Sequence, residues 1–248
     1  MKTMQIDLAI LDKFAFEIQP VAFKFLSNKP EGIKRLGEDM ALCQMVRAAQ
    51  QGGSFYADSE NIACNPAQFL LGCIDPPPLL ESGQLGAALE IFKDPRANRR
   101  IYQFIPRLGR STIAGVAFSD LRELSFDPDL VILTANTRQT EIILRALTYT
   151  TGKMWSSKMT TVMGCAWLLI HPYLSGEINY MNTGLGFGMI VRKVFPEGFQ
   201  LISIPFDLLP TVLKNLEDMR WVLRPYEEDG KEWHKNVFKE LGLPPPRY

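Results

Sequence analysis

Hydrophobic and polar positions alternate along the chain in short periods, which predict brief helices and strands rather than a few long elements. Residues 4–17 (MQIDLAILDKFAFE) have apolar side chains at helical spacing and predict an amphipathic helix. Residues 21–26 (VAFKFL) follow Pro20 and predict a short strand. A second helix is predicted to begin at Cys43 and to end at Gly52-Gly53, before a strand around Phe55-Tyr56.

The middle of the chain predicts further short elements. The sequence Cys64-Asn65-Pro66 predicts a helix over residues 66–72, with Asn65 at the N-cap and Pro66 at the first helical position. A stiff proline connector leads to a helical stretch over residues 79–93, and residues 95–111 are expected to form a loop. Residues 113–118 predict a strand, followed by Ser119-Asp120 and a short helix.

The pattern restarts after Phe126-Asp127-Pro128-Asp129, which we interpret as an internal boundary. Residues 129–135 (DLVILTA) predict a buried strand, and residues 137–150 predict an amphipathic helix. A helix headed by Cys165, a strand at residues 178–180 and a strand at residues 201–204 with a helix after it are predicted next. The polar tail predicts a last helix over residues 231–241 and a surface arm.

The two halves share an order of elements: strand, cysteine-headed helix, strand, polar turn, strand, Asp and helix. Cys43 and Cys165 occupy matching places, as do Asp120 and Asp207. We therefore predict an α/β fold, with α+β as the other option, built from two similar half-units that arose by tandem duplication. The predicted units are residues 1–127, residues 128–225 and a C-terminal arm at residues 226–248. The alternative is the ordinary strand–helix alternation of any α/β protein.

Composition and charge narrow the function. The 248 residues are 46% apolar, and 27 basic side chains balance 27 acidic ones, so a nucleic-acid or membrane-surface partner is not expected. No signal peptide or membrane span is recognisable, which favours the cytoplasm. Two histidines in the whole chain argue against a histidine-rich zinc site and against a catalytic triad. We expect a small-molecule partner; the oligomeric state does not follow from the sequence.

Three of the four cysteines, Cys43, Cys64 and Cys165, stand where a helix is predicted to begin. A helix N-terminus offers free N–H groups and the positive end of its dipole, which favour thiolates. We therefore predict that these cysteines ligate an iron–sulfur cluster of the 4Fe-4S type, because such clusters need soft thiolates. The alternatives are another metal such as zinc, or buried free cysteines. Cys73 lies in an apolar context and is expected in the core. The alternative is that Cys73 is the fourth ligand of the cluster.

Two polar or glycine-rich segments are further candidates. Ser156, Ser157 and Lys158 precede the Cys165 helix and would suit an anionic ligand, although ordinary turn residues are the alternative. Residues 184–188 (GLGFG) lack the strand-then-helix context of a dinucleotide fingerprint, so we interpret them as a loop that lets the backbone approach the site closely.

Several motifs resemble the domain of unknown function 169 family, found in uncharacterised proteins of archaea and anaerobic bacteria. They are Leu42-Cys43-Gln44, Cys64-Asn65-Pro66, the proline run, Ser82-Gly83, Pro106-Arg107-Leu108, Cys165-Ala166 and Pro172-Tyr173-Leu174-Ser175-Gly176. The resemblance spans roughly residues 20–216 and implies no established reaction. The family often has a fourth cysteine in a Cys-x-Gly turn, where this chain has Asn182-Thr183-Gly184. It thus implies a site of three cysteines, and we predict that Asn182 binds substrate at the open position.

Two classes of function remain open. Three thiolates on a four-iron cluster would leave one iron free to bind a small anionic substrate, which describes an open-site enzyme of anaerobic metabolism. The alternative is a protein without chemistry of its own: a cluster carrier, an electron-transfer protein with a redox partner, or a small-ligand sensor. A metal-free binding domain is the third option. Whether the protein is an enzyme is not decided by the sequence.

Overall fold

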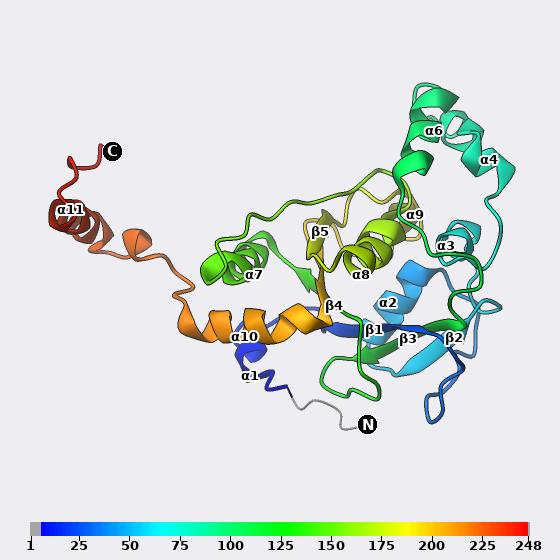
Figure 1. Cartoon of the computed structure of the whole chain (residues 1–248), viewed down its shortest axis with the longest axis horizontal. Helices are drawn as coiled ribbons and strands as arrows, with labels where there is room; N and C mark the ends of the chain where they lie inside the picture. Colours follow the sequence, from blue (N-terminus) through cyan, green and yellow to red (C-terminus); the bar gives the residue numbers. More distant parts are fainter. Residues whose placement is uncertain (1–5, 248) are drawn as a thin grey trace.

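Six strands form one sheet in the order β2-β3-β1-β4-β6-β5, and every pairing is antiparallel (Figure 1). The computed structural model describes residues 6–247, in which eleven α-helices and this sheet make one mixed α/β unit. The strands are β1 (Val21–Leu26), β2 (Phe55–Asp58), β3 (Gly115–Asp120), β4 (Leu130–Ala135), β5 (Asn179–Asn182) and β6 (Gln200–Pro205).

The strand order is the same from either end of the sheet when β1 is matched with β4, β2 with β5 and β3 with β6. The two central strands, β1 and β4, pair over three residue pairs centred on Ala22 and Val131. By contrast, β1 pairs with β3 over six residue pairs, and so does β4 with β6. The junction between the two halves of the sheet is therefore its shortest pairing.

Helices cover both faces of the sheet, which explains why β4 is apolar at nearly every position. Leu130 and Ile132 face one core cluster, whereas Val131 and Leu133 face another. The first face carries α2 (Leu42–Gln50), α3 (Asn65–Leu70), the π-helix η1 (Ala166–Ile170) and α8 (His171–Ser175). The second face carries α1 (Ala9–Asp12), α7 (Thr137–Tyr149) and α10 (Leu209–Asp218), which follows the short turn η2 (Phe206–Leu208).

A cap of three helices, α4 (Pro78–Glu81), α5 (Gln84–Ala88) and α6 (Pro95–Phe104), stands beyond α3 at one end of the molecule (Figure 1). Gly83 joins α4 to α5 with φ +79°, and a Cβ there would lie 2.1 Å from the carbonyl oxygen of Pro95. The side chain of Asn98 is fully buried and donates to the carbonyl of Gly83 at 3.1 Å. The cap is therefore held together by backbone approach and a buried hydrogen bond.

The C-terminal segment extends away from the sheet (Figure 1). It comprises the turn η3 (Arg224–Tyr226) and the helix α11 (Gly230–Glu240), in which Gly230 is the one buried residue. No helix in residues 6–247 is both long enough and apolar enough to cross a membrane.

Most of the predicted elements are confirmed near their predicted positions, including the strands over residues 21–26 and 129–135 and the helix over residues 137–150. The predicted mixed α/β class is also confirmed, with a sheet that is antiparallel throughout. The prediction for residues 4–17 is wrong in extent: α1 spans Ala9–Asp12, and Ala15 has φ +46°, which ends any helix. Residues 4 and 5 of that predicted helix lie outside the described residues.

The predictions for the cap and for two helix starts need correction. Residues 95–111 begin with helix α6 rather than a loop, because Asp94 caps it by accepting from the N–H of Ala97 and Pro95 occupies the first turn. The stretch over residues 79–93 is broken at Gly83. The residue at the N-cap of α3 is Cys64, not Asn65, and no helix follows Asp120.

Candidate functional site

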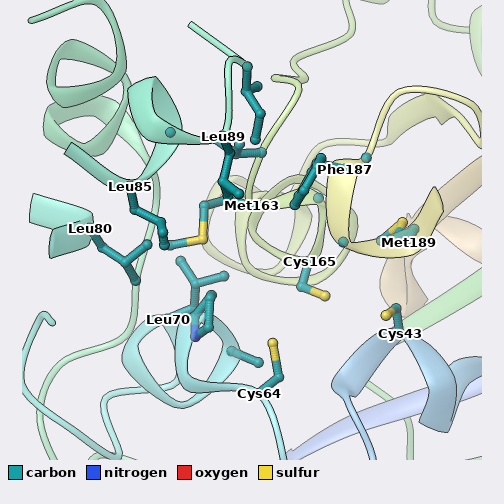
Figure 2. Close-up of a pocket in the computed structure, with 18 of the residues that line it drawn as sticks. Cys43, Cys64, Leu70, Leu80, Leu85, Leu89, Met163, Cys165, Phe187 and Met189 are labelled. Carbon is teal, nitrogen blue, oxygen red and sulfur yellow. The ribbon is translucent and has the colours of Figure 1, made fainter. Parts of the chain in front are cut away.

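Three cysteines from distant parts of the chain line one cavity of about 190 Å³. Cys43 is the second residue of α2, and Cys64 is the N-cap of α3. Cys165 is the second residue of a continuous helix that begins at Gly164 and runs through η1 and α8. Figure 2 shows the three side chains directed toward a common space from these three helix starts. Cys43 and Cys165 thus occupy the same position in their helices.

The surroundings of the sulfurs favour a thiolate at Cys43. The pKa of Cys43 is lowered, first because the thiol of Cys165 donates a hydrogen bond to its sulfur, and further by Arg192 and by the N–H groups of Cys43 and Gln44. The pKa of Cys165 is raised, because its proton is held by Cys43, because burial disfavours the charged form, and because Cys43 adds negative charge. Of these two coupled thiols, Cys43 is therefore the one favoured as a thiolate.

Arg192 is the charged residue that lines the cysteine pocket. It follows α9 (Phe187–Val191), and its Nη1 donates to the carbonyl of Gly188 at 2.9 Å. Its Nη2 lies 3.9 Å from the sulfur of Cys64. The sequence analysis missed Arg192, since a lone arginine after a glycine-rich segment carries no pattern of its own. The predicted close-approach segment over residues 184–188 does contribute here, because Gly186 and Gly188 also line the pocket. It follows strand β5 and leads into helix α9, so the prediction that it lacks a strand-then-helix context is wrong.

The rest of the lining is apolar. Met163 directly precedes the Cys165 helix with φ +61°, a conformation that is strained for a non-glycine residue. A Cβ on Gly164 would lie 2.9 Å from the terminal methyl of Met189, so this methionine packs closely against the start of the helix. Other apolar lining residues come from α3, the cap and α9: Leu70, Leu80, Leu85, Leu89, Ile91, Tyr102 and Phe187.

The donor set of the pocket consists of thiols, with no His, Asp or Glu in its lining. Within residues 6–247, no three His, Cys, Asp or Glu side chains are gathered closely enough to hold a single metal ion. A cluster spaces its ligands more widely than a single ion, since each thiolate binds a different iron atom. Thiolates are ligands of iron–sulfur clusters and of zinc, and both groups agree with this donor set.

Cys73 does not line the cysteine pocket. Its side chain is partly buried and packs against the apolar core, and burial raises the pKa of its thiol. The core position predicted for it matches these contacts.

The predicted substrate-binding residues do not join the cysteines. Asn182 ends the edge strand β5 and is exposed, because the neighbouring Met181 and Thr183 point inward. The hydroxyl of Ser157 donates to the carbonyl of Tyr180, and the N–H of Lys158 donates to Asn179 Oδ1 at 2.8 Å. Ser157 and Lys158 line a hollow beside α6, and Ser156 lines another beside α10. These segments hold β5 in place rather than line the pocket.

Comparison with known proteins identifies the class of protein. Residues 9–215 match the DUF169 family, described as "Uncharacterised ArCR, COG2043", and the chain belongs to this family. A similar protein is "Uncharacterized protein MJ0308" of Methanocaldococcus jannaschii, which is 25% identical over 208 residues, covering 82% of this chain and 88% of that protein. No solved structure matches the chain. The family assignment confirms the resemblance and brings no reaction with it.

Proposed function

We propose that the protein holds a 4Fe-4S cluster through Cys43, Cys64 and Cys165, with its fourth iron open to a small molecule. The observation that carries the proposal is that these three thiols, from separate helix starts, line one cavity. Helix N-termini stabilise thiolates, and N–H groups near the sulfurs suit cluster ligands. The cluster, when bound, would supply a Lewis-acidic iron to a small molecule in the pocket.

The chain's own residues would support such a cluster in two ways. Arg192 offsets the negative charge of the sulfurs, since its guanidinium lowers the pKa of Cys43. The leucines of α3 and the cap give the pocket an apolar wall beside the sulfurs, and an apolar wall strengthens electrostatic interactions with a bound cluster.

Reconstitution of the metal-free protein with iron and sulfide under anaerobic conditions tests the proposal. We expect about four iron and four sulfide per chain with broad visible absorption. Cys43→Ser, Cys64→Ser and Cys165→Ser should each lose at least half of the bound iron. Cys73→Ser and Asn182→Cys are matched controls outside the pocket and should keep the bound iron. Binding of zinc without sulfide, or unchanged iron content in all three serine variants, would contradict the cluster.

A second function, electron transfer to a redox partner without substrate chemistry, is favoured by one observation. Leu85 and Leu89 line the pocket and are also 37% and 47% exposed, so an apolar rim borders the cysteines. A partner protein docked on this rim would bring its redox centre close. One measurement separates the two functions. A small ligand that binds the open iron changes the visible absorption spectrum of the cluster, whereas adding the same ligand to an electron-transfer protein changes at most its reduction potential.

We also infer that the chain arose by tandem duplication of a strand–helix–strand–strand unit. Two features support this: the strand order is the same from both ends of the sheet, and Cys43 and Cys165 take the same place in their helices. The second half would then have gained α7 between β4 and the Cys165 helix, and the first half would have gained α3 and the cap between β2 and β3.

A further inference from the structure

The part of the cysteine pocket away from the sulfurs is shaped for an apolar group. Figure 2 shows Leu70, Leu80, Leu85 and Met163 gathered on one side of the space that Cys64 and Cys165 border. They come from α3, from the cap and from the residue before the Cys165 helix. A cavity of about 190 Å³ with an apolar lining suits a short hydrocarbon chain.

The same pocket contains one cation and no carboxylate. Arg192 takes part in none of the ion pairs formed by the described residues. One of its N–H groups is used by the carbonyl of Gly188, and the contact with Cys64 is long at 3.9 Å. A guanidinium has five N–H donors in a planar fork, so donors remain for a bidentate contact with a carboxylate.

We propose that the pocket binds a small monocarboxylate with a short apolar chain. The carboxylate pairs with Arg192, and the chain lies against the leucines of α3 and the cap. This proposal rests on the proposed function in one respect: the bound monocarboxylate would lie beside the cluster. Binding of the monocarboxylate itself requires the pocket and not the cluster. The carboxylate uses guanidinium N–H groups that the carbonyl of Gly188 does not occupy, and the hydrocarbon chain replaces water along the lining.

Calorimetric titration with butanoate, hexanoate and hexanol tests the proposal, on both the metal-free and the reconstituted protein at constant ionic strength. Hexanoate should bind about tenfold or more tightly than butanoate, because each buried CH₂ adds roughly fourfold. It should also bind at least about tenfold more tightly than hexanol, which lacks the charge.

Two sets of variants test the contributions of the ligand's carboxylate and of its hydrocarbon chain separately. Arg192→Gln should weaken hexanoate binding by about tenfold or more and leave hexanol binding unchanged, while Arg192→Lys should retain part of the affinity. Lys193→Gln is the matched control, since this neighbouring cation lines a different hollow. Leu85→Asn should reduce the ratio of hexanoate affinity to butanoate affinity, because the Leu85 side chain lines the pocket. Circular dichroism confirms that each variant folds.

The outcomes also separate this proposal from the proposed function. Hexanoate binding without any reconstituted cluster would leave the ligand class standing and overturn the cluster. A cluster with no hexanoate binding, or hexanoate binding that is the same in Arg192→Gln, would overturn the ligand class alone. Equal affinity for hexanoate and hexanol would also overturn it.

Discussion

At the scale of single residues, the position of each cysteine in its helix governs its chemistry. Cys43 and Cys165 each follow the first residue of a helix, and Cys64 is an N-cap, so all three cysteines stand at the positive end of a helix dipole. Cys73 lies past the end of α3 among apolar contacts, and burial raises the pKa of its thiol. Four residues of one type therefore divide into three candidate ligands and one packing residue.

Asp129 is a second residue whose position decides its behaviour. It lies at the junction of β1 and β4, where its carboxylate accepts from the N–H of Phe25 at 2.7 Å and lies 3.8 Å from Lys24 Nζ. Burial nevertheless raises the pKa of Asp129 above its ordinary value of 3.8. The loss of hydration outweighs both favourable contacts.

The raised pKa predicts a pH dependence that Asp129→Asn removes. A group with a raised folded-state pKa stabilises the fold fully below its unfolded pKa and loses that contribution as pH rises through the folded pKa. The free energy of unfolding of the wild type, minus that of Asp129→Asn, should therefore fall from pH 4 upward and then become constant. Urea unfolding between pH 4 and 7 measures it. The exposed Asp39→Asn is the control, and a difference that rises with pH would contradict the assignment.

At the scale of elements, the helix after Cys165 is widened by its own sequence. Pro172 has no N–H, so the carbonyl of Leu168 has no donor four residues later. The π-helix η1 spans Ala166–Ile170, where hydrogen bonds reach five residues ahead instead. The π-helix directly follows Cys165, and such segments are frequent at functional sites. Its cause here is readable in the sequence.

Helix α7 depends on a reciprocal cap at its start. The N–H of Gln139 donates to Asn136 Oδ1 at 2.9 Å, and the N–H of Asn136 donates to Gln139 Oε1 at 2.8 Å. We expect Asn136→Ala to lower the free energy of unfolding by about 1 kcal/mol. Thermal or urea unfolding measures this. Asn28→Ala, in an exposed turn, should change it by no more than about 0.5 kcal/mol; equal effects of the two substitutions would show that the cap contributes nothing.

At the scale of the whole molecule, the halves share a core although their strands pair only briefly. One core cluster combines Phe23 and Leu42 from the first half with Trp167 and Leu169 from the second. Burial of such side chains is the main stabilising term in folding. The halves therefore depend on each other through packing more than through the three residue pairs of the central junction.

This shared core predicts the behaviour of separate halves. Fragments of residues 1–127 and 128–248, expressed separately, should each lack a cooperative unfolding transition, because each exposes its side of the core. Mixing them should restore a transition and a one-to-one complex. Circular dichroism and size-exclusion chromatography measure both. A fragment that unfolds cooperatively alone would show that the halves are independent domains.

The sequence determined the local structure wherever its signals are local. Alternation identified β1, a continuous apolar run identified β4, helical periodicity identified α7, and the helix starts at Cys43 and Cys165 followed from where the apolar runs begin. The helix α6 was missed although its signal, Asp94 followed by Pro95, is also local. The three cysteines were singled out because their surroundings in the chain are alike.

Only the tertiary structure decided which residues share the pocket with those cysteines. Arg192 reaches Cys64 across 128 residues of sequence, and the cap supplies leucines that have no pattern of their own. Asn182 was expected at the site from its place in a motif, yet it ends an edge strand with its side chain exposed. Periodicity reports which side of its own element a residue occupies, whereas the pocket depends on how separate elements pack, which no local pattern encodes.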